Sequence, residues 1–396
     1  MPKTLVNIIT EDNPIPAYLF IKERYEVGDS LIYISAKDTE DDLDALSELF
    51  NVPIPHIKEI VLKHNKDEFT YEKICRTLLE SELDPNVNYC VNLAGGTRYM
   101  ALAVQQVFER FKSEFFYVQV EENLIVKSAF DDSIYNNDDY FFPIRHRMTI
   151  EEYLKAHEIS QNLNRYRHVP TRSKKESEYM YRLFSQHRLG DSDYKILEML
   201  RNDYRKRKNI KISAVETKGD GQGPVIPGLS RFLYEIRFIP RQSGILNKLE
   251  LEYLTGGWFE EYVYYLVKKY VKPQDIAIGV KISRAGVKHD NELDVVFTKG
   301  NKLFVIECKT GVRTERLFNE IVYKACAIKE ALLGVSCYSY IFSLTKDDRD
   351  NTLKIIAGNM DVIFYDHDIL TKPRKLHKAL TDICINSKDG VSRVYP

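Results

Sequence analysis

Apolar and polar positions alternate along the first 145 residues in a way that predicts strands separated by helices. Short apolar runs typical of buried strands occur at residues 5–9, 31–35, 58–62, 89–93 and 114–120. Helical spacing of apolar residues begins at Ala17 and Tyr99 and covers residues 41–50 and 69–82. This alternation indicates a mainly parallel, doubly wound α/β sheet, whose ligands lie beyond the carboxyl ends of its strands.

The pattern changes twice further along the chain. Residues 146–242 read as mainly helical and charged, with a Gly/Pro-rich loop at 217–228. A second α/β pattern then predicts a helix over 258–270, a strand over 276–283, a hairpin over 291–310, a helix over 314–333 and strands over 336–345 and 361–366. We therefore expect three regions, comprising residues 1–145, 146–242 and 243–396.

The predicted hairpin, NELDVVFTKGNKLFVIECKT, carries three charges within apolar strands. A two-residue Gly300-Asn301 loop would pair Thr298 with Leu303, Val296 with Val305, and Asp294 with Glu307. Because side chains alternate along a strand, Glu307 and Lys309 share one face.

Two carboxylates placed opposite each other repel, and ordinary sheets avoid this arrangement. A divalent cation such as Mg²⁺ or Mn²⁺ between Asp294 and Glu307 would remove the repulsion and could activate water against a phosphodiester. Lys309 could orient that water. Glu292, opposite Lys309, reads as a solvated acid rather than its partner. The alternative is a half-solvated hairpin whose charges form no site.

The helix GGWFEEYVYYLVKKY, residues 256–270, supplies a further acid. Helical spacing places Glu260 at the edge of an apolar stripe and Glu261 nearly opposite that stripe, facing water. Glu260 could complete an acidic metal cluster. The alternative is a first-turn glutamate that the helix dipole favours.

The stretch VNLAGGTRYMALAV, residues 91–104, predicts a strand, a Gly95-Gly96 turn and a helix that begins near Arg98. Backbone N–H groups at such a helix start attract anions, and glycine lets a phosphate approach closely. Thr97 and Arg98 could add a hydroxyl and a positive charge. The same turn could also be simple punctuation between a strand and a helix.

A helix acid, a strand aspartate and a Glu-x-Lys pair on the next strand together resemble the PD-(D/E)xK nuclease superfamily. Leu293 stands where the motif has proline. The resemblance implies a restriction-endonuclease-like fold with Glu260, Asp294, Glu307 and Lys309 as catalytic residues. It further implies that the three acids hold Mg²⁺ or Mn²⁺ and that Lys309 helps position the attacking water.

The Gly-Gly turn resembles the GG-T-[KR] motif of CARF (CRISPR-associated Rossmann fold) sensor domains, and NIITEDNPIPAYLFIKE, residues 7–23, resembles their first strand and loop. CARF sensors fused to PD-(D/E)xK domains form a group of type III CRISPR ancillary nucleases. The resemblance therefore implies a homodimer that a cyclic oligoadenylate activates, and cyclic tetra-adenylate is the activator we expect. The resemblance implies ligand contacts from Gly95, Gly96, Thr97 and Arg98. Strand-end geometry adds Thr10, Asn13 and Ser35.

Composition narrows this interpretation only slightly. Lys and Arg total 57 against 58 for Asp and Glu, so no global charge attracts nucleic acid. The basic runs at 164–175 and 201–211 could follow a phosphate backbone, with Tyr166 or Tyr204 stacking on bases, or could be solvated helix faces. The six scattered cysteines and the lack of a long apolar segment predict a reduced, cytoplasmic protein without a membrane span.

We therefore expect an activator-dependent, metal-dependent endonuclease that cuts single-stranded DNA, RNA or both. One alternative is a nucleotide-sensing regulator that binds nucleic acid without cleavage. The other is a constitutive nuclease of the repair or restriction type. Cleavage that needs no activator would favour the constitutive nuclease.

Overall fold

The computed structural model describes residues 2–9, 13–35, 47, 50–62, 70–128, 140–157, 159–161, 169–204, 209–212, 226–284, 291–311, 315–328, 337–345 and 352–386. Thr10, Tyr166, the side chain of Tyr204 and most of the helix predicted over 41–50 lie outside these residues. No helix among the described residues is both long and apolar enough to cross a membrane.

The N-terminal sheet has seven strands in the order β3-β2-β1-β4-β5-β6-β7. Their bounds are β1 Thr4–Ile9, β2 Ser30–Ser35, β3 Ile57–Val61, β4 Tyr89–Asn92, β5 Ser113–Gln119, β6 Leu124–Ser128 and β7 Phe141–Pro143. Strands β1 to β5 run parallel, and β6 and β7 add an antiparallel edge. The five predicted apolar runs are these five parallel strands.

Alternating side chains of these strands enter two separate cores. Leu5 of β1 packs with helix α1 (Ile15–Arg24), while Val6 and Ile8 pack with α3 (Tyr71–Glu80) and α4 (Arg98–Phe108) on the other face. A short 3-10 turn, η1 (Ile54–His56), precedes β3. Helices therefore cover both faces, as the predicted doubly wound sheet requires.

The middle of the chain is mainly helical but contributes to both neighbours. Its elements are α5 Ile150–Ala156, β8 Ile159–Gln161, α6 Lys174–Ser185, α7 Asp191–Tyr204, β9 Asn209–Lys211, α8 Leu229–Glu235 and β10 Ile245–Asn247. Strands β9 and β10 form a small antiparallel pair, whereas β8 joins the edge of the C-terminal sheet. The division at residues 145 and 242 stays a prediction.

The C-terminal sheet has the order β15-β14-β13-β12-β11-β8. Its elements are α9 Lys248–Glu252, the π-helical turn η4 Tyr253–Gly257, α10 Trp258–Tyr270, β11 Asp275–Arg284, β12 Asn291–Lys299, β13 Lys302–Lys309, α11 Glu315–Ile328, β14 Cys337–Ser343, α12 Thr352–Asn359, β15 Val362–Tyr365, α13 His367–Thr371 and α14 Pro373–Asn386. Helices α10 and α14 share the core on one face of this sheet, and α11 and α12 pack on the other.

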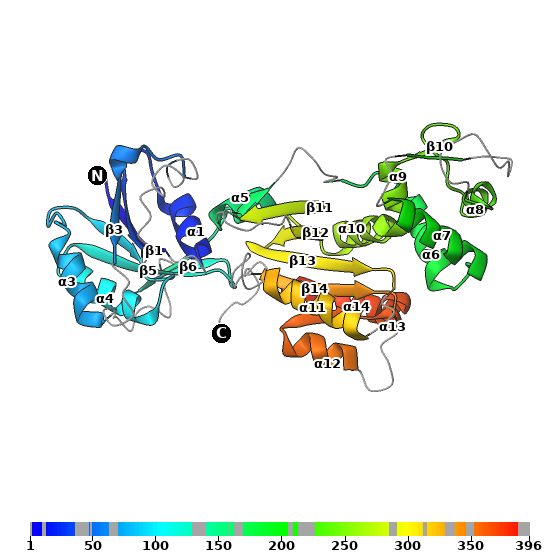
Figure 1. Cartoon of the computed structure of the whole chain (residues 1–396). Helices are drawn as coiled ribbons and strands as arrows, with labels where there is room; N and C mark the ends of the chain where they lie inside the picture. Colours follow the sequence, from blue (N-terminus) through cyan, green and yellow to red (C-terminus); the bar gives the residue numbers. More distant parts are fainter. Residues whose placement is uncertain are drawn as a thin grey trace.

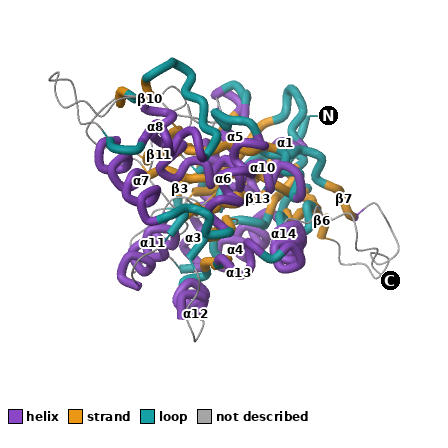
Figure 2. The backbone as a smooth tube through the Cα atoms, turned by 90° about the vertical axis from the view of Figure 1, so that its right-hand side faces the viewer, coloured by secondary structure: helices purple, strands orange, loops and turns teal. Residues whose placement is uncertain are grey.

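Figure 1 shows the N-terminal sheet beside the left-hand ends of the yellow strands β12 and β13. One apolar core spans this junction, because Leu303 and Val305 of β13 pack in the same cluster as Leu19 of α1 and Leu154 of α5. Figure 2 views the molecule from the opposite end of these strands, where α6 and α7 lie; α6 packs against α10. The mixed α/β class predicted for both halves is confirmed.

Candidate functional site at the end of the β12–β13 hairpin

The hairpin forms with the predicted loop and register. Gly300 and Asn301 have φ of 58° and 59°, the positive values that a two-residue hairpin turn requires. Thr298 pairs with Leu303 and Val296 with Val305, as predicted. The paired ladder ends at Val295 and Ile306, one step before Asp294 and Glu307, so the predicted pairing of Asp294 with Glu307 is not part of it.

A change of face occurs at Asp294. Ile278 of β11 and its partner Val295 pack in the core beside α10, whereas Val280 and its partner Leu293 pack in the core on the other face. Residues two apart on a regular strand share a face, so the alternation is broken between these pairs. Gly279, with φ of 61°, lies at the break and allows it. Such irregularities re-aim side chains, here that of Asp294.

Asp294, Glu307 and Lys309 form one connected network. Nζ of Lys309 lies 2.6 Å from Oε1 of Glu307 and 3.3 Å from Oδ2 of Asp294. The same Oδ2 accepts a hydrogen bond of 2.7 Å from the backbone N–H of Cys308, beyond the end of the regular ladder. The positively charged ammonium group of Lys309 thus lies within reach of both predicted metal ligands. Glu292 forms an ion pair with Lys281 at 3.8 Å and not with Lys309.

Burial and charge shift the protonation of this network. Burial raises the pKa of Glu307, and the neighbouring Asp294 raises it further, against the partial opposition of Lys309. Burial disfavours the charge on Lys309, but Asp294 and Glu307 more than offset this and hold its pKa above the usual value. The site therefore keeps Lys309 positive and resists a second negative charge at Glu307.

Glu260 approaches the same end of β13 from helix α10. Burial raises the pKa of the Cys308 thiol well above its usual value, and the charges of Asp294 and Glu260 raise it further. Glu260 is half-buried. Its predicted place at the edge of the core therefore agrees with the structure.

The prediction that Glu261 faces water is wrong. Glu261 is fully buried. Its carboxylate accepts hydrogen bonds from the Thr171 N–H at 2.8 Å, the Thr171 hydroxyl at 2.7 Å, the Arg172 N–H at 3.1 Å and the Ser177 hydroxyl at 3.4 Å. The helical stripe rule assumes one covered face, whereas α6 and the segment before it cover the second face of α10.

The donor set suits a hard cation. Asp294 and Glu307 supply carboxylate oxygens, the ligands that Mg²⁺ and Mn²⁺ prefer. Burial, and then the charge of Asp294, raise the pKa of Glu307, and a bound cation would oppose both effects. Among the described residues, no three His, Cys, Asp or Glu side chains are grouped closely enough to hold a metal by themselves. The three-acid set with Glu260 stays a prediction, in which waters and phosphate oxygens complete the coordination.

Arg172, in the basic run 164–175, belongs to the fold rather than to a surface site. The guanidinium of Arg172 lies 2.9 Å from the carboxylate of Glu250 and 4.2 Å from the ring centroid of Phe238. Its side chain is only 10% exposed. Arg172 therefore holds the segment before α6 against α9, and it is not available to follow a phosphate backbone.

The second candidate site lies between β1 and β4, where the strand order of the N-terminal sheet reverses. The helices that follow these two strands, α1 and α4, pack on opposite faces of the sheet. Such a switch point leaves a crevice at the carboxyl ends of the strands. The described predicted ligand residues follow β1 and β4 or, for Ser35, end β2, as expected for this crevice.

Glycine is required in the turn after β4. A Cβ on Gly95, where φ is 105°, would lie 2.5 Å from the carbonyl oxygen of Ile8, and one on Gly96, where φ is 66°, would lie 2.4 Å from Cγ2 of Ile8. The turn thus packs directly on the end of β1. Thr97 caps α4 by accepting the Met100 N–H at 3.3 Å.

The remaining described ligand candidates lie at or near the ends of α4, α1 and β2. Arg98 is exposed at the first position of α4, and Asn13 is half-buried before α1. Ser35 ends β2 and donates a hydrogen bond of 2.9 Å to Glu59. Thr10 lies outside the described residues. Their contacts with a ligand stay predictions.

Sequence analysis missed a buried asparagine pair beneath this crevice. Asn7 and Asn92 are fully buried and in register on β1 and β4. The Asn92 amide donates to Oδ1 of Asn7 at 3.1 Å, while Oδ1 of Asn92 accepts the Ala94 N–H at 3.0 Å. The signal was present, because LVNII and YCVNL each carry one asparagine within an apolar run.

Two family models match the two parts of the chain that carry these candidate sites. Residues 4–153 match the family model for the Card1 CARF domain, and residues 247–372 match that for the Card1-like endonuclease domain. No curated protein matches the chain.

Solved structures share the fold over nearly the whole chain. Protein VC1899 from Vibrio cholerae is 20% identical, with 98% of this chain and 99% of that chain covered and a TM-score of 0.70. Can2 from Sulfobacillus thermosulfidooxidans, solved with cyclic tetra-adenylate, is 21% identical, with 97% and 99% covered and a TM-score of 0.65. A type III CRISPR defence DNA nuclease activated by cyclic oligoadenylate is 13% identical, with 96% of this chain and 52% of that chain covered and a TM-score of 0.52.

The two matched domains lie in one chain and in the predicted order, with the motif residues on the expected strands. The resemblance to a CARF sensor fused to a nuclease is thereby confirmed. The chain belongs to the Card1-like nucleases, which join an N-terminal CARF domain to a C-terminal endonuclease domain.

Proposed function

We propose that this chain is a metal-dependent endonuclease of type III CRISPR defence that a cyclic oligoadenylate activates, and that it cuts single-stranded DNA, RNA or both. The proposal rests on one observation. In a Card1-like endonuclease domain, Asp294 and Glu307 on adjacent strands both contact the ammonium of Lys309. A buried and a partly buried acid with an adjacent lysine have the groups that hydrolysis of a phosphodiester needs.

Each residue has a distinct part in the proposed mechanism. Asp294 and Glu307 would hold Mn²⁺ or Mg²⁺, assisted by Glu260. When bound, such an ion lowers the pKa of water and offsets charge on the phosphate. Lys309, which its two carboxylate neighbours keep charged despite its burial, would orient the attacking water or stabilise the developing negative charge. The Cys308 N–H fixes the Asp294 carboxylate in place.

The CARF domain would supply the control. Can2, of similar fold, was solved with cyclic tetra-adenylate. We infer that two copies of this chain form a homodimer whose paired crevices bind one such ring, since a two-fold ligand suits a two-fold assembly. Gly95, Gly96, Thr97 and Arg98 would line the crevice. Activation requires that the ring bind the active arrangement more tightly than the inactive one.

The test is cleavage of labelled single-stranded DNA and RNA with Mn²⁺, in the presence and absence of cyclic tetra-adenylate. Wild type, Glu307→Gln and Glu292→Gln are compared. Glu292 is the matched control, because it lies on the same hairpin, is half-exposed and pairs with Lys281. We expect cleavage only with the activator, lost in Glu307→Gln and kept in Glu292→Gln.

Each alternative gives a different result. Equal cleavage with and without the activator would contradict the sensor assignment and favour a constitutive nuclease. Binding of labelled strands without cleavage by any variant would favour a regulator that only binds nucleic acid. Loss of cleavage in Glu292→Gln as well would show that the effect of Glu307→Gln is not specific to the site.

A further inference from the structure

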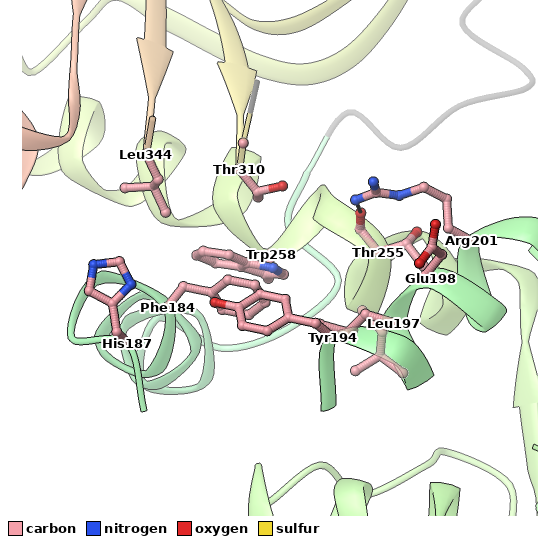
Figure 3. A pocket seen from close by; sticks show the side chains of 12 residues that line it. Phe184, His187, Tyr194, Leu197, Glu198, Arg201, Thr255, Trp258, Thr310 and Leu344 are labelled. Atoms are coloured by element: carbon pink, nitrogen blue, oxygen red, sulfur yellow. Dashed lines mark hydrogen bonds between the residues drawn. The ribbon is translucent and has the colours of Figure 1, made fainter. Parts of the chain in front are cut away.

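A cavity of about 250 Å³ opens beside the candidate catalytic site. Helices α6 and α7, the π-helical turn, the first residue of α10 and the segments after β13 and β14 form its wall. Its lining includes Phe184, Tyr194, Glu198, Arg201, Trp258 and Thr310. Figure 3 shows these side chains around the open space.

Aromatic rings form one side of this cavity. The ring of Phe184 stacks on Trp258 with centroids 4.5 Å apart, and Tyr194 meets Phe184 edge to face at 6.2 Å. Trp258 is buried, which fixes its ring, whereas Tyr194 is 43% exposed at the mouth. Figure 3 shows the three rings together below Thr310. An exposed ring backed by fixed rings is a platform on which a planar base can stack.

Polar groups lie at the other side of the cavity. Arg201 donates a hydrogen bond of 3.0 Å to the carbonyl of Thr255, which fixes the guanidinium at the wall. Its remaining N–H groups suit the acceptors of a base edge or a phosphate oxygen. Glu198, one helical turn before Arg201 on α7, adds acceptors for the amino groups of a base. An apolar platform with a few fixed polar groups is typical of a small-molecule subsite.

The cavity adjoins β13, which carries Lys309, and α10, which carries Glu260. Thr310 directly follows Lys309, and Trp258 precedes Glu260 by two residues on α10. One residue of a strand advances about 3.3 Å, so Thr310 lies only one short step beyond Lys309 along the chain. A base in the cavity would therefore belong to a nucleotide within one or two of the phosphate at Lys309.

We propose that this cavity binds one unstacked base of a single-stranded nucleic-acid substrate, next to the phosphate that is cut. The inference rests on the proposed endonuclease function and specifies its substrate class. A base in a duplex is already stacked and would have to be flipped out before it could enter. Stacking on Tyr194 and Phe184 would anchor the strand, and Arg201 with Glu198 would set a preference among bases.

The chain provides its own reporter for this cavity, because Trp258 is the only tryptophan in the sequence. The experiment titrates the full-length Glu307→Gln chain, with Mn²⁺ and cyclic tetra-adenylate, with short single strands of DNA and RNA and with a duplex. Fluorescence anisotropy of the labelled strand reports binding, and Trp258 emission reports entry of the base. We expect single strands to quench Trp258 as they bind and the duplex to leave the emission unchanged.

Tyr194→Ala and an abasic nucleotide test the contact from both sides. Stacking contributes enough for Tyr194→Ala to weaken single-strand binding by about 5- to 140-fold. An abasic site is moved along the strand one nucleotide at a time. In the parent protein, which retains Tyr194, it should weaken binding at one nucleotide position, and in Tyr194→Ala it should have little further effect. Arg201→Gln provides a second variant with little risk to folding, because its side chain is exposed.

Tyr234→Ala is the matched control, since Tyr234 is 84% exposed on α8 and is not part of the cavity lining. It should bind as the parent does. Saturated binding without quenching of Trp258, equal quenching by the duplex, or an abasic effect that survives in Tyr194→Ala would overturn the inference. Failure of the proposed function is recognised separately, as absence of wild-type cleavage despite normal quenching.

Discussion

The side-chain amide of Asn301, at the tip of the β12–β13 hairpin, donates a hydrogen bond of 2.9 Å to Oδ1 of Asn123 in the β5–β6 turn. Both side chains are buried. Oδ1 of Asn301 accepts the Met148 N–H at 2.9 Å, and its amide also donates to the His146 carbonyl at 3.0 Å. A turn of the CARF sheet is therefore fixed to the hairpin that carries Asp294 and Glu307.

The contact between Asn301 and Asn123, called the joint below, suits transmission of a structural change between the domains, because a hydrogen-bonded strand is stiff. Glu307 lies six residues beyond Asn301, a span of about 20 Å along β13. A shift of the β5–β6 turn would thus be carried by backbone pairing to the other end of the hairpin. Coupling between the CARF crevice and the catalytic site requires a structural element whose arrangement both sites influence, and the hairpin is the candidate for that element.

Asn301→Gly tests the joint. Glycine keeps the positive φ of 59° and removes all three side-chain hydrogen bonds. Buried groups left without partners cost about 1–3 kcal/mol each, so the free energy of unfolding should fall by an amount in this range or somewhat above it. Denaturant titration measures it. The stimulation ratio, which is the cleavage rate with activator divided by the rate without it, should fall. It should fall by a larger factor than the cleavage rate at saturating activator.

Asn51→Gly is the control for this change. Asn51 also has a positive φ, 55°, and is exposed, so the substitution should leave both stability and stimulation nearly unchanged. If Asn301→Gly lowers stability but leaves the stimulation ratio intact, the joint holds the domains together without transmitting the signal.

Glu260 and Glu261 are neighbours with opposite expected roles. The Glu261 carboxylate is buried and accepts four hydrogen bonds. In Glu261→Gln, one of its oxygens becomes an NH₂ group, which would face the N–H and O–H donors that now bind that oxygen. Hydrogen bonds to charged groups contribute about 1.5–3 kcal/mol, and we expect a loss of unfolding free energy of at least this size. Glu260→Gln should lower cleavage by at least tenfold with little change in stability.

Measuring both quantities on both variants separates the two roles. Thermal unfolding gives the stability, and cleavage at a temperature where both proteins are folded gives the activity. A Glu260→Gln protein with full cleavage would remove Glu260 from the catalytic set. A Glu261→Gln protein of normal stability would mean that the buried carboxylate contributes nothing net to the fold.

The sequence predicted those features that depend on local geometry. Alternation along 291–310 was sufficient for the turn and register of the hairpin, because a two-residue loop leaves one pairing. It could not show that Gly279 on a different strand breaks the alternation opposite Asp294. Nor could the helical period show that α6 covers Glu261, since the contact with Ser177 of α6 joins residues 84 positions apart.

Gly95→Ala tests the crevice between β1 and β4. The new methyl group would lie 2.5 Å from the Ile8 carbonyl oxygen, a backbone atom that cannot move without distorting β1. We expect loss of at least tenfold in affinity for cyclic tetra-adenylate, measured by calorimetry, together with lower stability. Gly28→Ala is the control, because Gly28 has a similar φ of 100° and open space around its Cβ position.

The comparison isolates the close approach from the cost of a positive φ. Both variants pay the conformational cost of alanine in this region, of the order of 1–2 kcal/mol. Only Gly95→Ala adds the clash with Ile8. Equal affinity for the activator in wild type and Gly95→Ala would show that the ligand does not contact this turn.

Glu307 makes the effect of metal depend on pH. Its pKa in the folded protein is raised by burial and by Asp294 above the ordinary value of about 4.3, so the folded state binds this proton more tightly than the unfolded state. Without metal, ionised Glu307 therefore costs stability, and the cost appears as the pH rises from about 4.3 through the raised pKa. Glu307→Gln removes it.

Thermal unfolding of the metal-free proteins across this pH range should show Glu307→Gln gaining on wild type as the pH rises. Added Mn²⁺ competes with the proton for Glu307, so it should stabilise wild type increasingly toward neutral pH and leave Glu307→Gln unchanged. Glu292→Gln should follow wild type throughout, because Glu292 is half-exposed and pairs with Lys281. A stabilisation by Mn²⁺ that is equal in wild type and Glu307→Gln would place the metal elsewhere in the protein.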